Sequence, residues 1–207
     1  MAGYVSDAVI KRLPAYYRHL QELEKEGVTQ ISSKDLGERM NFTASQIRQD
    51  INSFGGFGRQ GYGYSVTGLR QHIGHVMGLD TAHRMIIVGG GNIGRAIAGS
   101  ASFERIGFET VAIFDSDPRK IGEEIHGITV QDIAVLERFV SEQPVDIAVL
   151  AVPAREAQMM AERLYALGVK GFWNFAPVDL KLPKGAVAEN VHLDESLEVL
   201  SFRILQE

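Results

Sequence analysis

A glycine-rich run between an apolar segment and a helical segment constrains this chain more than any other feature of its sequence. Residues 84–88 are typical of a short buried strand, and Gly89-Gly90-Gly91-Asn92-Ile93-Gly94 follows directly, leading into helical residues 95–98. This is G-x-G-x-x-G between a strand and a helix, the context that a dinucleotide-binding motif requires. The first glycine permits the turn, the second lets the backbone approach a pyrophosphate, and the third lets the helix pack on the strand. The helix N-terminus adds amide donors and a favourable dipole.

An acidic residue ends the next predicted strand. Residues 110–114 are apolar, and Asp115 follows them about 20 residues beyond the last glycine, as this fold expects. A carboxylate here accepts hydrogen bonds from ribose hydroxyls and repels a 2′-phosphate, which favours NAD(H) over NADP(H). Arg119 and Lys120 follow shortly and weaken that exclusion. The predicted cofactor-binding residues are Gly89, Gly90, Gly91, Asn92, Ile93, Gly94, Asp115, Val152 and Pro153.

Strand and helix patterns continue to alternate after Asp115. Residues 133–140 and 154–167 are helical in pattern, the second with Met159 and Met160 inward, and residues 146–152 and 169–175 are strands. This alternation predicts a Rossmann-type, parallel, doubly wound sheet. Ligands of such sheets lie at the carboxyl ends of the strands, so residues after Val152 and residues 174–177 are candidates for the nicotinamide end. The alternative is a Rossmann-like domain that binds no nucleotide, or another ligand such as one of the coenzyme A type.

The first eighty residues predict a helix-turn-helix. One helix runs to Gly27, with Pro14 either kinking it or lying in the first turn of a new helix. Ser32 or Ser33 caps a second helix, and Thr43 caps a third over residues 44–51, with Gln46 completing a capping box. Buried Ile positions leave a polar face on the third helix that suits phosphates and base edges. Its predicted DNA-binding residues are Ser45, Gln46, Arg48 and Gln49.

A glycine-rich hairpin follows and completes a predicted winged helix. Tyr62, Tyr64 and Val66 alternate as in a strand, and Thr67 is expected to cap the next helix. The hairpin tip would be Arg59 and Gln60, suited to minor-groove insertion, although a structural hairpin with a solvated arginine gives the same pattern.

Charge is distributed unevenly and permits DNA contact despite the net charge of -5. Residues 1–80 carry nine Lys and Arg against eight Asp and Glu, whereas residues 81–207 carry twelve against eighteen. A near-neutral front half is compatible with a DNA-binding domain.

The C-terminal segment predicts an unusually apolar helix. Residues 194–206 carry too many apolar side chains for one exposed face, so the helix is expected to pack between two chains or to be exchanged with a partner. The alternative is an ordinary helix covering its own sheet. We therefore predict three parts: a winged helix over 1–80, a Rossmann domain over 81–189 and a dimerisation helix over 190–207.

Several classes of protein are disfavoured. The chain has no cysteine, which removes disulfides, thiolate metal sites and cysteine nucleophiles. His72 and His75 suggest no metal site, since no third ligand is evident, and neither His126 nor His192 lies in a pattern typical of a catalytic base. We expect no enzyme activity. Residues 1–7 lack the order of a signal peptide and no apolar run is long enough to span a bilayer, so a cytoplasmic location is expected.

The residues resemble the Rex family of redox-sensing transcriptional repressors over nearly the whole chain. The matching stretches are Arg12-Leu13-Pro14, Tyr17-Arg18, Gln46-Ile47-Arg48 with Asp50, Phe54-Gly55-Gly56-Phe57-Gly58, Gly61-Tyr62-Gly63-Tyr64, the glycine motif, Asp115-Ser116-Asp117-Pro118, Ala151-Val152-Pro153-Ala154 and Asn174-Phe175-Ala176-Pro177. The resemblance implies a homodimer that binds palindromic operator DNA and is released by NADH, while NAD+ competes and permits binding. It also implies exchange of the C-terminal helix between subunits.

Three positions depart from the family pattern. Gln49 stands where the family usually has Lys, Ser100 where it often has Tyr, and His192 where it often has Asp. In the family, that Tyr, that Asp and the residue matching Arg18 form a network that responds to NADH, so the switch residues predicted here are Arg18, Ser100 and His192. Two other functions stay open: a small NAD-dependent oxidoreductase, and a DNA-binding protein with a vestigial nucleotide site.

Overall fold

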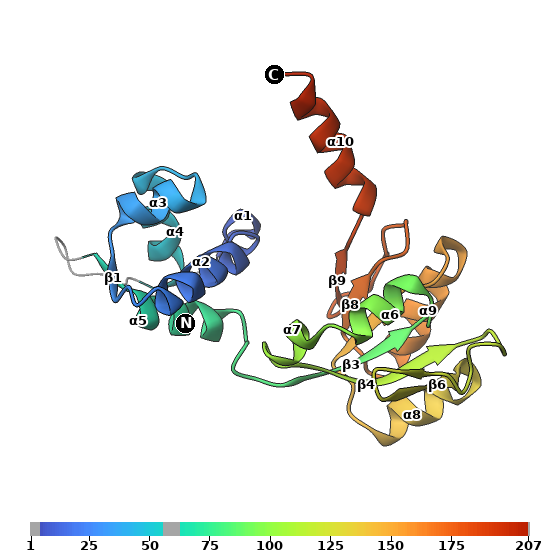
Figure 1. Ribbon diagram of the computed structural model, residues 1–207. Helices are drawn as coiled ribbons and strands as arrows, with labels where there is room; N and C mark the ends of the chain where they lie inside the picture. The colour runs from blue at the N-terminus through green and yellow to red at the C-terminus, as the bar shows by residue number, and fades with distance from the viewer. Residues whose placement is uncertain (1–4, 56–62, 207) are drawn as a thin grey trace. The chain divides into compact units, whose positions relative to one another are not determined.

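The chain forms two compact units whose boundary lies between Thr81 and Ala82 (Figure 1). The structure is a computed structural model that describes residues 5–55 and 63–206. Each unit has its own buried core and is considered by itself.

Unit 1 is helical, with one short antiparallel pair of strands. Its elements are α1 (Asp7–Ile10), α2 (Leu13–Lys25), β1 (Gln30–Ile31), α3 (Ser33–Met40), α4 (Ala44–Phe54), β2 (Tyr64–Ser65) and α5 (Val66–Val76). Pro14 lies in the first turn of α2, where its missing N–H costs nothing. Ser32 Oγ accepts a hydrogen bond from the Asp35 amide at the start of α3, and Thr43 Oγ accepts one from the Gln46 amide at the start of α4. The predicted helix-turn-helix is confirmed as α3 and α4.

Two local predictions in unit 1 are corrected. Thr67 was expected to cap the next helix, but the helix begins at Val66, because Ser65 Oγ accepts from the Gly68 amide and is the cap. The capping box at Thr43 is only half formed, since the side chain of Gln46 turns to Asp50 instead of back to the cap. The predicted hairpin tip, Arg59 and Gln60, lies outside the described residues.

Unit 2 is built around a seven-stranded sheet. Its elements are β3 (His83–Val88), α6 (Asn92–Ala98), α7 (Ala101–Glu104), β4 (Phe108–Asp115), β5 (Glu124–Ile125), β6 (Ile128–Asp132), a 3-10 turn (Ile133–Val135), α8 (Leu136–Glu142), β7 (Ile147–Leu150), α9 (Ala154–Ala166), β8 (Gly171–Asn174), β9 (Val187–Asn190) and α10 (Leu193–Ile204). The strand order is β5-β6-β4-β3-β7-β8-β9, and every pairing is parallel except that of β5 with β6. The predicted doubly wound sheet is confirmed.

Helices bury the two faces of this sheet in separate apolar clusters. On one face, α8 and α9 pack through Leu136, Val140 and Leu164 on alternate residues of the central strands. On the other face, α6 and α7 contribute Ile97 and the half-buried Phe103. Met160 points inward as predicted, but Met159 is 60% exposed, so the prediction for that residue is wrong. Adjacent helical positions are about 100° apart, and only one of the two reaches the sheet.

The C-terminal helix α10 buries none of its residues within the chain. Its large apolar side chains are all at least half exposed: Leu193, Leu197, Val199, Leu200, Phe202, Ile204 and, at the C-cap, Leu205. The alternative in which this helix covers its own sheet is therefore wrong.

Candidate nucleotide and DNA sites

The glycine motif forms the tight connection from β3 to α6. Gly89 has φ +107°, and a Cβ there would collide with the carbonyl of Ala151, the residue that follows β7. A Cβ on Gly94 would collide with the carbonyl of Gly89, so this glycine lets α6 pack closely on its strand. A Cβ on Gly91 would meet nothing within 4 Å, which leaves open space beside the backbone. Gly89 and Gly94 thus have the packing roles that their spacing predicts, and the pyrophosphate role of Gly91 stays a prediction.

Asp115 ends β4 next to this loop and is 7% exposed. Its Oδ2 accepts hydrogen bonds from the Gly90 amide (2.7 Å) and from Lys120 Nζ (2.9 Å), and its Oδ1 accepts one from the Asp117 amide (2.8 Å). Burial alone would raise the pKa of Asp115, but these donors outweigh it and hold the pKa below its usual value. The carboxylate is therefore ionised at neutral pH and is partly neutralised by Lys120.

A cavity of about 460 Å³ opens at the carboxyl ends of β3, β4 and β7. Of the nine predicted cofactor-binding residues, its lining includes Gly89, Gly91, Asp115, Val152 and Pro153. Gly90 contributes its amide to Asp115, while Asn92, Ile93 and Gly94 form the first turn of α6.

Other cavity-lining residues were missed by the sequence prediction. Arg155 lies in the first turn of α9, Met160 lies further along the same helix, and Ile133 follows β6. For Arg155 and Ile133, a position soon after a strand end was the available signal, because ligands of such sheets bind at that edge.

Residues 174–177 form a structural loop instead of lining this cavity. Asn174 is fully buried, and its Nδ2 donates to the Val178 carbonyl (2.6 Å) and to Asn190 Oδ1 (2.9 Å). Its Oδ1 accepts from the Ala176 amide (3.1 Å). All of its polar atoms are therefore used within the chain, and the expectation that this segment lies at the ligand is not supported.

On the second helix of the helix-turn-helix, α4, a polar stripe faces solvent. Ser45, Arg48 and Gln49 are exposed, and Asn52 continues the stripe one turn further. Arg48 Nη1 donates to Ser33 Oγ at the start of α3 (3.1 Å). Asn52 was missed by the sequence prediction, although its spacing of seven from Ser45 places it on the same face.

A buried charge cluster lies beneath that stripe. Asp50 on α4 is 1% exposed and forms two hydrogen bonds with the guanidinium of Arg12, from Nε (2.7 Å) and Nη2 (2.8 Å). Tyr16 Oη (3.0 Å) and Gln46 Nε2 (2.7 Å) also donate to it. Burial would raise the pKa of Asp50, but these hydrogen bonds together hold it below its usual value. The pKa of Tyr16 is raised, mainly by burial and to a smaller extent by its hydrogen bond to Asp50.

The three predicted switch residues belong to different units of the chain. Arg18 is exposed on α2 of unit 1. In unit 2, Ser100 is at the N-cap of α7 with its Oγ 2.6 Å from Ser102 Oγ, and His192 Nε2 lies 2.9 Å from Asp179 Oδ1. The hydrogen bond with Asp179 raises the pKa of His192 above 6.5.

Two kinds of feature are absent from the described residues. Within 5–55 and 63–206, no group of three or more His, Cys, Asp or Glu side chains is arranged to hold a metal ion. Over the same ranges, no helix has the length and apolar character needed to cross a membrane.

Family models match the two units separately. The model described as "Putative DNA-binding protein N-terminus" matches residues 4–52, and the model described as "CoA binding domain" matches residues 80–178.

Full-length relatives are similar over almost the entire chain. A redox-sensing transcriptional repressor Rex from Clostridium tetani is 52% identical over 96% of this chain and 94% of its own length. A protein of the same name from Thermoanaerobacter sp. is 49% identical over 98% of this chain and 91% of its own length.

Solved structures show the same similarity. A crystal structure of the protein RSP in complex with β-NAD+ and operator DNA has a TM-score of 0.93 and 48% identity, covering 98% of this chain and 94% of that one. RSP in complex with β-NADH has a TM-score of 0.91 and 46% identity, covering 98% and 95%.

Proposed function

Because the chain belongs to the Rex family of redox-sensing transcriptional repressors, we propose that it represses transcription by binding operator DNA through unit 1 and leaves the DNA when NADH binds in unit 2. The observation that carries the proposal is that one chain combines two features. The exposed stripe of α4 is polar, and the cavity of unit 2 is lined by glycines and by the buried carboxylate of Asp115. The similar protein RSP was crystallised with operator DNA and β-NAD+, and separately with β-NADH.

The cavity of unit 2 suits the adenosine half of NAD(H). The open space beside Gly91 and the N-terminus of α6 suit a pyrophosphate, and Asp115 lies where a ribose would present its hydroxyls. Val152 and Pro153 then lie on the nicotinamide side of the sheet. All nine residues predicted from the sequence are retained as the proposed cofactor site.

The exposed stripe of α4 suits the major groove of DNA. Ser45, Arg48 and Gln49 on the stripe, with Gln46 beside it, are the proposed contacts, and Asn52 is added to them. Arg59 and Gln60 keep their proposed role at the tip of a wing, in a segment outside the described residues.

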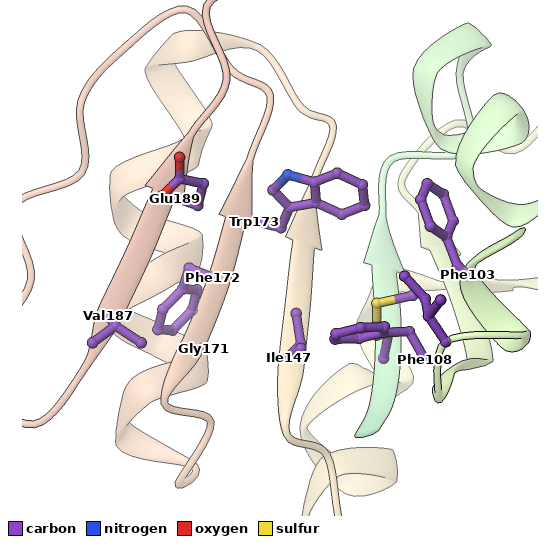
Figure 2. A pocket seen from close by; sticks show the side chains of 10 residues that line it. Phe103, Phe108, Ile147, Gly171, Phe172, Trp173, Val187 and Glu189 are labelled. Atoms are coloured by element: carbon purple, nitrogen blue, oxygen red, sulfur yellow. The ribbon is translucent and has the colours of Figure 1, made fainter. Parts of the chain in front are cut away.

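A homodimer is proposed because unit 2 leaves two apolar surfaces uncovered. The first is α10, which exposes apolar side chains on two sides of the helix. Leu197 and Leu200 lie on one side, and Val199 and Phe202 lie on another. The second is an apolar cavity of about 390 Å³ between α7 and strands β3, β7, β8 and β9 (Figure 2). Trp173 and Phe103 both line it and meet edge to face, with ring centroids 5.3 Å apart. A second copy of the chain would cover both surfaces through exchanged α10 helices.

The remaining parts of the proposal concern organisation and chemistry. We propose a winged helix over 1–80, a nucleotide domain over 81–189 and a dimerisation helix over 190–207. Arg18, Ser100 and His192 are retained as the proposed switch residues. We propose no catalytic activity, which agrees with the repressor names of the relatives, and a cytoplasmic location.

A mobility-shift assay on palindromic duplex DNA, titrated separately with NADH and NAD+, tests the proposal. We expect a specific complex that NADH dissociates and that NAD+ leaves intact. The Arg48→Ala variant should lose specific binding but keep NADH binding, measured by calorimetry. A complex indifferent to NADH, together with no NADH binding, would favour a vestigial nucleotide site. Hydride transfer to any of a panel of carbonyl substrates would favour an oxidoreductase.

A further inference from the structure

Asp50 has a protein donor for each of its acceptor positions. Its Oδ1 accepts from Arg12 Nη2 (2.8 Å) and Gln46 Nε2 (2.7 Å), and its Oδ2 accepts from Arg12 Nε (2.7 Å) and Tyr16 Oη (3.0 Å). A carboxylate offers about four lone-pair sites, so this one is saturated. The guanidinium of Arg12 also lies 5.8 Å from the ring centroid of Phe42, in the turn between α3 and α4. The cluster therefore joins the start of α2, the turn and the recognition helix.

This arrangement determines which way the amide of Gln46 faces. An ionised carboxylate can only accept hydrogen bonds, so the amide atom at 2.7 Å from Asp50 must be the NH2 group. One of its two N–H groups is thereby occupied. The second N–H and the carbonyl oxygen Oε1 have no partner among the described residues, and together they form an edge with one donor and one acceptor.

Gln46 is placed where such an edge can meet a base. It lies in the first turn of α4, is half-buried, and borders the exposed stripe of Ser45, Arg48 and Gln49. The N-terminal residues of a recognition helix are the ones that contact base edges in the major groove. A donor–acceptor amide edge matches adenine, which presents the N6 amino group and the N7 acceptor. Guanine presents two acceptors there and leaves Oε1 without a partner.

We propose that Gln46 reads an A·T base pair in each operator half-site, with Oε1 accepting from adenine N6 and Nε2 donating to N7, and that Asp50 is the positioning residue that holds its amide in this orientation. The inference rests on the proposed DNA-binding function. Without Asp50 the amide can rotate by 180°. Nε2 would then face the adenine N6 amino group, and Oε1 would face N7, so neither hydrogen bond could form.

The test begins with a library of palindromic duplexes whose half-sites are randomised. The full-length wild-type protein should enrich an A·T pair at one position of each half-site, preferred about tenfold or more over the other pairs. Gln46→Met, of similar length but without polar groups, should lose the preference at that position and keep it at the others. Replacing this adenine with 7-deazaadenine, which lacks the N7 acceptor, should weaken the wild-type complex by roughly 3- to 10-fold. The Gln46→Met complex should not change.

Asp50→Asn and Tyr16→Phe form a matched pair of variants for the positioning role. Asp50→Asn should reduce the preference for adenine at the Gln46 position to less than about threefold. The base preferences at the other positions should fall by less. Tyr16→Phe removes a different donor to Asp50, so it should leave the preference intact. An equal loss at all positions in Asp50→Asn would indicate a merely structural role and overturn the positioning claim.

Two further outcomes separate this inference from the proposed function. If the wild-type protein selects sites but tolerates 7-deazaadenine at every adenine, or if Gln46→Met keeps the full pattern of preferences, the adenine contact is wrong while DNA binding stands. If the wild-type protein selects no duplex, the proposed function fails and the inference fails with it.

Discussion

Asp50 in unit 1 and Asp115 in unit 2 are both buried, ionised carboxylates paired with a cation, yet they differ in what surrounds them. Asp50 is held by the planar fork of Arg12 and has no free acceptor. Asp115 has one flexible ammonium partner, Lys120, and lies in the wall of an open cavity. An arginine fork fixes both oxygens, whereas a lysine is a point charge that can move aside. The first carboxylate therefore holds side chains of its own unit in place, and the second is available to a ligand.

The largest expected effect comes from breaking the locked pair. Arg12→Met leaves Asp50 buried without its charge partner, which typically costs about 3–5 kcal/mol of unfolding free energy. Chemical denaturation followed by circular dichroism measures this loss. Arg12→Lys keeps the charge but loses the fork, so it should fall between the wild type and Arg12→Met.

The pH dependence gives this prediction a sign. In the wild type the folded-state pKa of Asp50 is lowered, so its stabilisation is present above the unfolded value of about 3.8 and is lost as the pH falls through the folded pKa. In Arg12→Met that pKa should instead be raised by burial, and protonation should relieve the destabilisation. The stability difference between the two proteins should therefore narrow toward acid pH, and a constant difference would contradict the assigned cause.

Asp115→Ala should mainly affect ligand binding. Losing charge-assisted hydrogen bonds to a ribose should weaken NADH about tenfold or more. NADPH should be weakened less, because Lys120 is then free to meet the 2′-phosphate. Calorimetric titration with both nucleotides measures the gap between them. Unchanged discrimination would refute the ribose role of Asp115.

Lys120→Met sharpens the same comparison from the other side. Without the ammonium group, the negative charge of Asp115 is less compensated and should repel a 2′-phosphate more strongly. We expect NADH affinity within about threefold of the wild type and NADPH affinity lowered about tenfold, which are modest effects because Lys120 is one-third exposed. Equal losses for both nucleotides would mean that Lys120 contacts the shared part of the ligand.

Sequence patterns predicted the surroundings of Asp115 better than those of Asp50. The positions of Gly89, Gly94 and Asp115 follow from spacing, because a strand, a tight turn and a helix leave few geometries. The cluster around Asp50 did not follow from spacing, since Arg12 is 38 positions away in the sequence and reaches Asp50 only through the tertiary fold of unit 1. Gln46 shows the same limit: its position fitted a capping box, but a buried charge four residues on competed successfully for its amide.

The C-terminal helix shows what local pattern does predict. Its apolar excess indicated a helix that cannot remain alone, and in the structure none of α10 is buried. Burial depends on the whole assembly, whereas helical periodicity depends on the segment itself. The pattern therefore predicted the helix itself, whereas its packing on a partner chain stays a prediction.

A third acid–base pair lies at the surface, and breaking it should have the smallest effect on stability. His192 at the N-cap of α10 contacts Asp179, whose side chain is 76% exposed. Its raised pKa means that the pair stabilises below the unfolded value of 6.5 and that the contribution is lost as the pH rises through the folded pKa, the opposite direction from Asp50. In an NMR titration, Asp179→Asn should return the pKa of His192 toward 6.5, although Glu195 and Asp194 still favour the charged ring. Solvent screens such a pair, so global stability should not change measurably. If Asp179→Asn left the pKa of His192 unchanged, the contact between the two side chains would not form in solution.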